Sequence, residues 1–163
     1  MPLPAHLEHG WTALPEAIGT DLNQAPKKGL MLVYSKRRLN AWKRSSDIPA
    51  VIMGSPFVLY RRLMQIKKSK RAKGTVAFPS HSTIFLESQF DIDKYCQILK
   101  NLDKKFQPIT ICLLHTDIKL GRDKIYQKHG FKVVSAGKKL RGSLSFVKNF
   151  YKILSSHRYS TSN

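Results

Sequence analysis

The first residues that could do chemistry are a histidine and a glycine near the start of the chain, His9 and Gly10. An imidazole titrates near neutral pH, so His9 could act as a general base that removes a proton from a hydroxyl group. The glycine that follows would let a substrate approach the backbone closely. A histidine followed by glycine is also common in ordinary polar turns, so both interpretations stay open.

Hydroxyl and imidazole groups also gather where apolar runs end. These candidate donor-binding and phosphate-binding residues are Ser80, His81, Ser82, Thr83, His115, Ser160, Thr161 and Ser162. Ligands of parallel sheets bind beyond the carboxyl ends of the strands, where hydroxyls and free backbone N–H groups could hold a phosphate or a ribose. The alternatives are turns that satisfy their own backbone, a helix cap at Asp117 and a frayed tail.

The charge of the chain requires an anionic partner. Lys and Arg number 29 against 10 Asp and Glu, which gives a formal net charge of +19. Nucleic acid, anionic lipid or a phosphorylated substrate would each suit such a chain. The candidate anion-binding residues are Arg71, Lys73, Lys138, Lys139 and Arg141. Aromatic residues do not alternate with the basic ones, so we expect no stacking platform for single strands, and a solvated face is the simplest alternative.

Several kinds of site are excluded by what the sequence lacks. Its two cysteines form no C-x-x-C pair, which argues against a disulfide scaffold and a structural zinc site. Walker, G-x-G-x-x-G, G-x-S-x-G and H-E-x-x-H motifs do not occur. We therefore expect no metal and no cofactor. No apolar run approaches the roughly 20 residues that span a bilayer, and the first residues do not form a signal peptide, so we expect a cytoplasmic protein that could lie on the inner face of the membrane.

The elements that must position these residues alternate between short apolar runs and helical patterns, which predicts a parallel α/β fold. Predicted strands cover residues 30–34, 50–53, 75–78, 108–114, 131–135 and 158–161. Predicted helices follow Ser35 and cover residues 121–130, and a last one begins at Ser143 or Ser145. A helix that runs from Pro56 to about Ile66 would place Leu59, Leu63 and Ile66 on one face. A helix that begins at Ser88 or Asp91 and runs to about Lys105 would turn its apolar residues inward, namely Tyr95, Ile98, Leu99 and Leu102. Residues 1–29 are rich in Pro and Gly and are expected to be irregular, apart from a short helix near residues 15–18.

A charged segment divides this pattern. Residues 67–74 are nearly free of apolar side chains and are predicted to form a basic linker between residues 1–66 and residues 75–163. The part before the linker offers about two strands, which are few for a sheet of typical size. The last predicted strand stops where the sequence stops. We therefore expect a Rossmann-like parallel sheet with flanking helices that is incomplete at both ends.

Five pieces of the chain occur in an order that resembles a known family. They are the His9-Gly10 pair, the Gly54-Ser55-Pro56 segment, and residues 75–83, 108–115 and 146–163. In this order they resemble the middle of a GT-B glycosyltransferase-like protein of the surface-polysaccharide or CDP-glycerol glycerophosphotransferase type. That layout also resembles bacterial proteins without an assigned activity, notably cyanobacterial ones. The resemblance covers most of the chain, although no single motif in it is specific.

The resemblance implies a different role for each of the two parts of the chain. Residues 1–66 would be a remnant of the acceptor lobe, with His9 as the base, and residues 75–163 would be part of the nucleotide-binding lobe. Ser80, His81 and Ser82 would hold the diphosphate of a nucleotide-activated sugar or polyol phosphate, and nearby lysines would offset its charge. The acceptor would be a growing surface glycan. We expect the chain to be inactive alone and to need a complementary chain. The alternatives are a nonenzymatic nucleic-acid-binding module and a structural α/β remnant that needs a partner chain.

Overall fold

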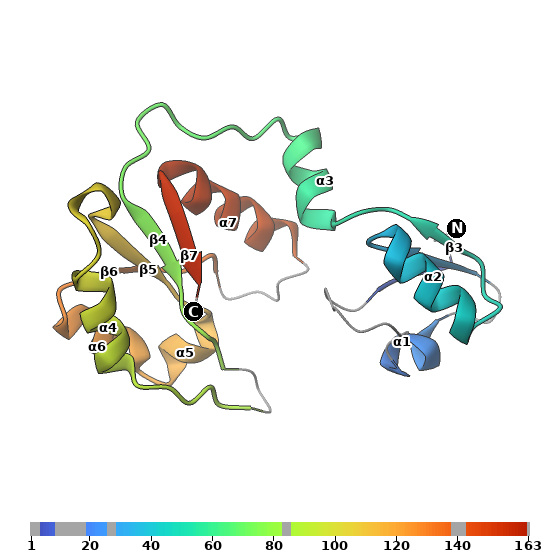
Figure 1. Ribbon diagram of the computed structural model, residues 1–163, viewed down its shortest axis with the longest axis horizontal. Coiled ribbons are helices and arrows are strands. Elements are labelled where there is room, and N and C mark those ends of the chain that lie inside the picture. The colour runs from blue at the N-terminus through green and yellow to red at the C-terminus, as the bar shows by residue number, and fades with distance from the viewer. Residues whose placement is uncertain (1–3, 9–18, 26–28, 83–85, 138–142, 163) are drawn as a thin grey trace. The chain divides into compact units, whose positions relative to one another are not determined.

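The computed structural model describes residues 4–8, 19–25, 29–82, 86–137 and 143–162 of the 163-residue chain. The chain divides into two units, Met1–Met64 and Gln65–Asn163. Each unit has its own sheet, and every strand pair in both sheets is parallel (Figure 1). The predicted Rossmann-like α/β class is therefore confirmed.

The first unit is built on a three-stranded sheet in the order β1-β2-β3. Its elements are β1 (Ala5–Leu7), α1 (Gly19–Gln24), β2 (Leu30–Val33), α2 (Lys36–Ser45), β3 (Ala50–Ile52) and α3 (Pro56–Leu63). Strand β2 is central, since Leu32 pairs with Leu7 of β1 and with Val51 of β3. The expectation that residues 1–29 lack a strand was wrong, because β1 is a three-residue strand that depends on its pairing with β2.

Helix α2 closes the core of the first unit. It begins after Ser35, as predicted, and the Ser35 hydroxyl accepts a hydrogen bond from the Arg38 N–H at 3.3 Å. Trp42 packs against Met31 and Val33 of β2, and its indole N–H donates to the Ile48 carbonyl at 2.8 Å. The largest buried side chain of this core therefore has its polar atom satisfied.

Helix α3 differs from its prediction in length and in burial. It ends at Leu63 rather than near Ile66, and none of its residues is buried. The predicted apolar face does not form a core contact, since the side chains of Leu59 and Leu63 are 40% and 71% exposed.

The second unit has a four-stranded sheet in the order β6-β5-β4-β7. Its elements are β4 (Thr75–Phe78), α4 (Ile92–Lys100), the 3-10 helix η1 (Lys104–Phe106), β5 (Ile109–Cys112), α5 (His115–Lys119), α6 (Arg122–Lys128), β6 (Lys132–Val134), α7 (Leu144–Ser156) and β7 (Tyr159–Ser162). Strand β4 lies between β5 and β7, with Val76 paired to Thr110 on one side and to Ser160 on the other.

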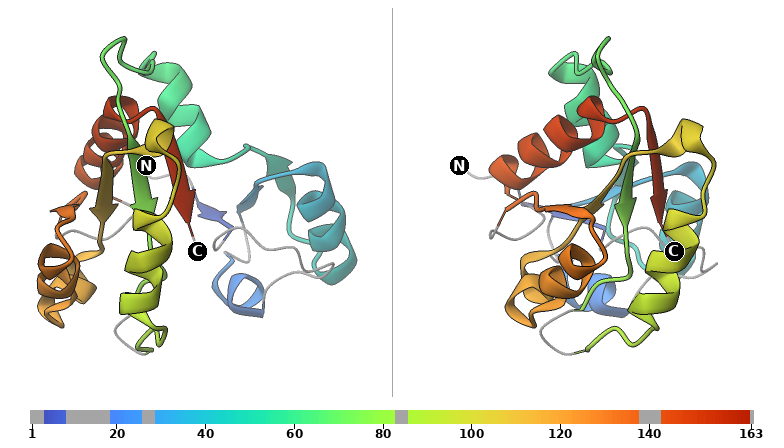
Figure 2. Two further views of the ribbon diagram at one scale, coloured as in Figure 1. Left: turned by 60° about the vertical axis from the view of Figure 1, so that its left-hand side comes forward. Right: turned by 90° about the vertical axis from the view of Figure 1, so that its left-hand side faces the viewer.

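Helices cover both faces of this second sheet (Figure 2). Ala77 of β4 packs with Cys96 and Leu99 of α4 and with Tyr126 of α6. The next residue, Phe78, points to the opposite face because side chains alternate along a strand. There its ring lies 5.4 Å from that of Phe150 on α7. Helices α4 and α6 therefore cover one face and α7 covers the other, as in doubly wound sheets.

Three details of the second unit differ from the prediction. The helix expected over residues 91–105 ends at Lys100 and is followed by η1. Ile98, expected to face the core, is 54% exposed, whereas Leu99 is 3% exposed. Helix α5, which directly follows the strongest strand, was not predicted.

Candidate functional site

The strand order of the second unit reverses between β4 and β7. From β4 the chain adds β5 and then β6 on one side, and it returns to place β7 on the other side. In open α/β sheets, ligands bind outside the carboxyl ends of the two strands where such a reversal occurs. Phe78 at the end of β4 pairs with Ser162 at the end of β7. The loop after β4 therefore starts beside the end of β7, although the two lie about eighty residues apart.

This reversal brings together two of the groups predicted from the sequence. Ser80 is exposed and His81 is half-buried directly after β4, and Ser162 is exposed beside them. Ser160 is exposed but pairs with Val76, which places it two residues back from the carboxyl end, about 7 Å at the usual rise of a strand. The hydroxyl of Thr161, which lies between them, donates to the Ser162 carbonyl at 3.4 Å.

Ser82 holds the loop after β4 in place. Its side chain is 1% exposed, and its N–H donates to the Asp117 carboxylate at 3.1 Å. Its hydroxyl accepts from the Ser88 N–H at 3.2 Å, and its carbonyl accepts from the Thr116 hydroxyl at 2.8 Å. All three polar groups of Ser82 are therefore used within the protein, so the role that the structure gives Ser82 is to shape the loop.

A buried ion pair anchors the same loop to the helices after β5. Asp117 is 1% exposed and lies 3.4 Å from the guanidinium of Arg122. Arg122 also donates to the Glu87 carboxylate at 3.2 Å and to the Ser88 carbonyl. Because Asp117 and Arg122 lie on α5 and α6, this pair joins the ends of β4 and β5 into one framework. His115, the first residue of α5, is half-buried at the same edge of the sheet.

Two of the predicted anion-binding residues, Arg71 and Lys73, lie at the edge of the sheet opposite to the loop after β4. Arg71 and Lys73 precede β4 and lie at the amino ends of the strands, whereas Ser80 and His81 follow β4 at the carboxyl ends. These side chains are therefore separated by the length of the strand and do not share one phosphate. The other predicted anion-binding residues, Lys138, Lys139 and Arg141, lie outside the described part of the chain.

The first unit carries a buried ion pair at the carboxyl edge of its own sheet. Glu8 follows β1 directly and is 2% exposed, and its carboxylate accepts hydrogen bonds from the Arg38 guanidinium and from the Tyr34 N–H, the latter at 3.0 Å. Arg38 is 4% exposed and lies in the first turn of α2. The positive end of the helix and the guanidinium together stabilise the carboxylate. This pair fixes the chain at the residue before His9.

A second buried carboxylate lies in the same unit. Asp21 of α1 is 1% exposed, and its carboxylate oxygen Oδ1 lies 3.1 Å from Nε2 of the His6 imidazole. Burial raises the pKa of the nearby Tyr34 phenol, and the negative charges of Glu8 and Asp21 raise it further. Tyr34 therefore keeps its proton to a higher pH than an ordinary tyrosine does.

Sequence reasoning missed Glu8 and Arg122, and it did not identify the partners of Arg38 and Asp117. One signal was present, because Arg38 lies on the same helix face as Ala41 and Trp42, and a cation on an apolar face requires a buried acid. Five predicted site residues lie outside the described part of the chain, so their predictions stay untested: His9, Thr83, Lys138, Lys139 and Arg141.

Comparison with known proteins identifies no relative: no family model, no curated protein and no solved structure matches the chain. Among the described residues, no helix is long and apolar enough to cross a membrane. Within the same residues, no group of three or more His, Cys, Asp or Glu side chains could hold a metal ion.

Proposed function

We propose that the second unit binds the phosphates of a nucleotide-activated sugar or polyol phosphate beyond the ends of β4 and β7. The observation that carries this proposal is the strand order β6-β5-β4-β7, which pairs Phe78 with Ser162. Hydroxyl and imidazole groups then lie at the position in the fold where ligands of such sheets bind. The Asp117–Arg122 pair supports the proposal because it ties Ser82 and Ser88, on either side of the loop after β4, to helices α5 and α6.

In this site Ser80, His81 and Ser162 would donate hydrogen bonds to the phosphate oxygens. The basic segment of residues 138–142 follows β6 and would supply the positive charge, in place of Arg71 and Lys73. His115 would lie near the nucleotide because it follows the adjacent strand. Hydrogen bonds to a charged phosphate stabilise it more than bonds to a neutral group do.

In the first unit we propose that His9 acts as the general base toward an acceptor hydroxyl of a surface glycan. The imidazole would take the hydroxyl proton as the oxygen attacks the anomeric carbon of the donor. The bond between that carbon and the diphosphate oxygen would break, and the nucleoside diphosphate would leave with the electron pair. With a polyol phosphate donor, the hydroxyl would attack phosphorus and the nucleoside monophosphate would leave. The Glu8–Arg38 pair would act as a positioning device for the loop that begins at His9.

This proposed function would require the protein to lie at the inner face of the membrane, where a growing glycan is held. It would also require a complementary chain that completes the transferase. Group transfer would then require both chains, so the proposal is tested by binding rather than by turnover.

Isothermal titration of the full chain with CDP and UDP tests the donor site. We expect saturable binding that weakens about tenfold or more in His81→Ala and in Ser162→Ala, since each loses a hydrogen bond to a charged group. Ser156→Ala is the matched control, because Ser156 is an exposed hydroxyl at the opposite edge of the sheet. Absence of saturable binding, or equal weakening by the control, would contradict the donor site.

A further inference from the structure

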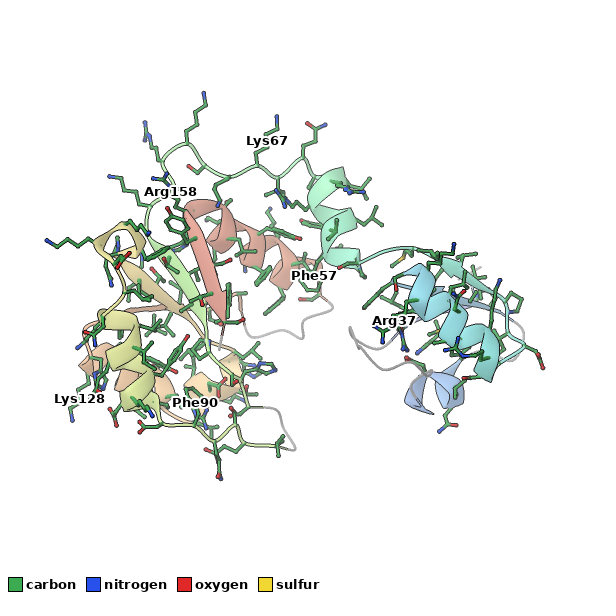
Figure 3. The ribbon with its side chains drawn as sticks, viewed as in Figure 1. Arg37, Phe57, Lys67, Phe90, Lys128 and Arg158 are labelled. Atoms are coloured by element: carbon green, nitrogen blue, oxygen red, sulfur yellow. The ribbon has the colours of Figure 1, made fainter. Side chains whose placement is uncertain are left out.

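The amino edge of the second sheet is lined with cations that the proposed donor site does not use. Because all four strands are parallel, the segments that precede them meet at this edge. Each of these segments brings exposed basic residues, which we call the basic edge: Lys67, Lys68, Lys70, Arg71 and Lys73 before β4, Lys104 and Lys105 before β5, Lys132 at the start of β6, and Arg158 before β7. Figure 3 shows this edge with Lys67 and Arg158 labelled.

Contacts between segments far apart in the sequence hold the basic edge together. The Lys68 ammonium donates to the carbonyl of Arg158, and the Arg158 N–H donates to the Gly74 carbonyl at 2.9 Å. The backbone N–H groups of Ser69 and Lys73 donate to the last carbonyls of α7, at 2.8 Å and 3.3 Å. The segment before β4 is therefore fixed across the end of α7, which places its cations at the negative end of that helix.

Two aromatic rings lie within the basic edge. Phe106 and Tyr159 are half-buried, and their centroids are 4.9 Å apart. The Lys105 ammonium lies 5.0 Å from the Phe106 ring, and the Arg158 guanidinium lies 5.7 Å from the Tyr159 ring. Aromatic and basic residues do not alternate along the sequence, but the fold places these two rings beside Lys105 and Arg158.

The basic edge carries little opposing charge. In the segments 65–74, 101–108, 129–132 and 157–159 the only acidic residue is Asp103. That carboxylate is 71% exposed and lies 3.4 Å from Lys105. The remaining cations of these segments therefore present an excess of positive charge to solvent.

The chain enters the basic edge from two exposed apolar residues. Leu63 and Met64 are 71% and 58% exposed and precede Lys67 by only a few positions. A nucleic acid backbone needs positive charge alone, whereas stable attachment to a bilayer needs a polybasic surface together with an apolar group that enters the interface. The combination of exposed apolar residues with the cations that follow favours a bilayer.

We infer that the basic edge docks on an anionic lipid bilayer. This inference deepens the proposed function, because it names the surface through which the protein would reach a membrane-held acceptor. The lysines and arginines would contact lipid phosphates, the Phe106–Tyr159 pair would lie at the level of the headgroups, and Leu63 and Met64 would enter the interface.

Sedimentation with vesicles tests this docking on the full chain. The probes are phosphatidylcholine vesicles with and without about a third of phosphatidylglycerol, at two salt concentrations. We expect binding only to the anionic vesicles, with a strong decrease at high salt. Each cation near the surface is worth about fivefold in the partition coefficient. The fourfold variant Lys68→Gln, Lys70→Gln, Arg71→Gln and Lys73→Gln should then bind about thirtyfold more weakly or worse, even if only two of the four cations touch the lipid.

The matched control removes the same number of positive charges from helices α4, α5 and α6. It combines Lys94→Gln, Lys119→Gln, Lys124→Gln and Lys128→Gln. All four of these lysines are exposed. The control should keep most of the binding, and Leu63→Ser with Met64→Ser should weaken binding at both salt concentrations.

Equal weakening by both fourfold variants would overturn the inference, because it would show that only net charge matters. Binding to a labelled DNA or RNA duplex without binding to anionic vesicles would also overturn it, in favour of a nucleic acid. Vesicle binding requires no nucleotide, so its failure would leave the donor-site titration unaffected, and the reverse holds as well.

Discussion

Replacing Asp117 with alanine should release the loop after β4. Asp117 is 1% exposed, holds the Ser82 N–H at 3.1 Å and lies 3.4 Å from the Arg122 guanidinium. At that distance and an effective dielectric constant of about 20, the gross attraction is about 5 kcal/mol, and breaking a buried pair typically costs about 3–5 kcal/mol. In the variant Arg122 keeps the Glu87 carboxylate and the Ser88 carbonyl as partners. We therefore expect the free energy of unfolding to decrease by about 3 kcal/mol, the lower end of that range.

Hydrogen exchange measured on peptides from residues 79–91 reads out this loss locally, alongside urea unfolding followed by far-ultraviolet circular dichroism. Tryptophan fluorescence is unsuitable because both tryptophans belong to the first unit. A loss of about 3 kcal/mol corresponds to exchange that is faster by about two orders of magnitude. Asp103→Ala is the control, since its pair with Lys105 has the same 3.4 Å distance but is exposed, and it should change stability by less than about 1 kcal/mol. Equal effects of the two substitutions would refute the role assigned to Asp117.

Three further substitutions or conditions give defined outcomes. Gly74→Ala should lower the free energy of unfolding in urea by at least about 1 kcal/mol more than Gly130→Ala does. Both glycines have a positive φ, but only at Gly74 would the new Cβ meet a backbone atom, the Pro108 oxygen at 2.0 Å. Glu8→Ala should cost about 3 kcal/mol by the same measurement, since it removes the buried carboxylate that accepts from the Arg38 guanidinium and the Tyr34 N–H, and a neutral result would contradict the buried pair. Burial raises the pKa of the Cys96 and Cys112 thiols to about 11, so these thiols keep their protons in the folded state at a pH where the unfolded state has lost them. The free energy of unfolding should therefore be unchanged below about pH 9 and should decrease between about pH 9 and 11. Replacing both cysteines with alanine should reduce that decrease.

The sequence predicted the elements whose signal is local. The apolar run of β4 lies between Gly74 and Pro79, and the serines before α2 and α7 cap their helices as expected. Strand β1 was missed because three residues carry no periodicity, and only the pairing with β2 makes them a strand.

The candidate site depends on contacts that no local pattern reveals. That the loop at Ser80 starts beside Ser162 follows from the strand order, which is set by long-range packing. The pairing of Glu8 with Arg38 joins residues thirty positions apart. The sequence therefore predicted that polar segments follow the ends of strands, but it could not predict which of these segments lie next to one another. It also could not predict that Arg71 and Lys73 lie at the edge of the sheet opposite to Ser80.

A titration of isotope-labelled protein with CDP and UDP, followed by the amide resonances in nuclear magnetic resonance spectra, tests the central claim most directly. The claim is that the carboxyl ends of β4 and β7 form one ligand site. It predicts saturable shifts at the amides of Ser80, His81 and Ser162 that share a single dissociation constant. Shifts confined to the basic edge around Arg71 and Lys73, or no saturable shift at either edge, would contradict it.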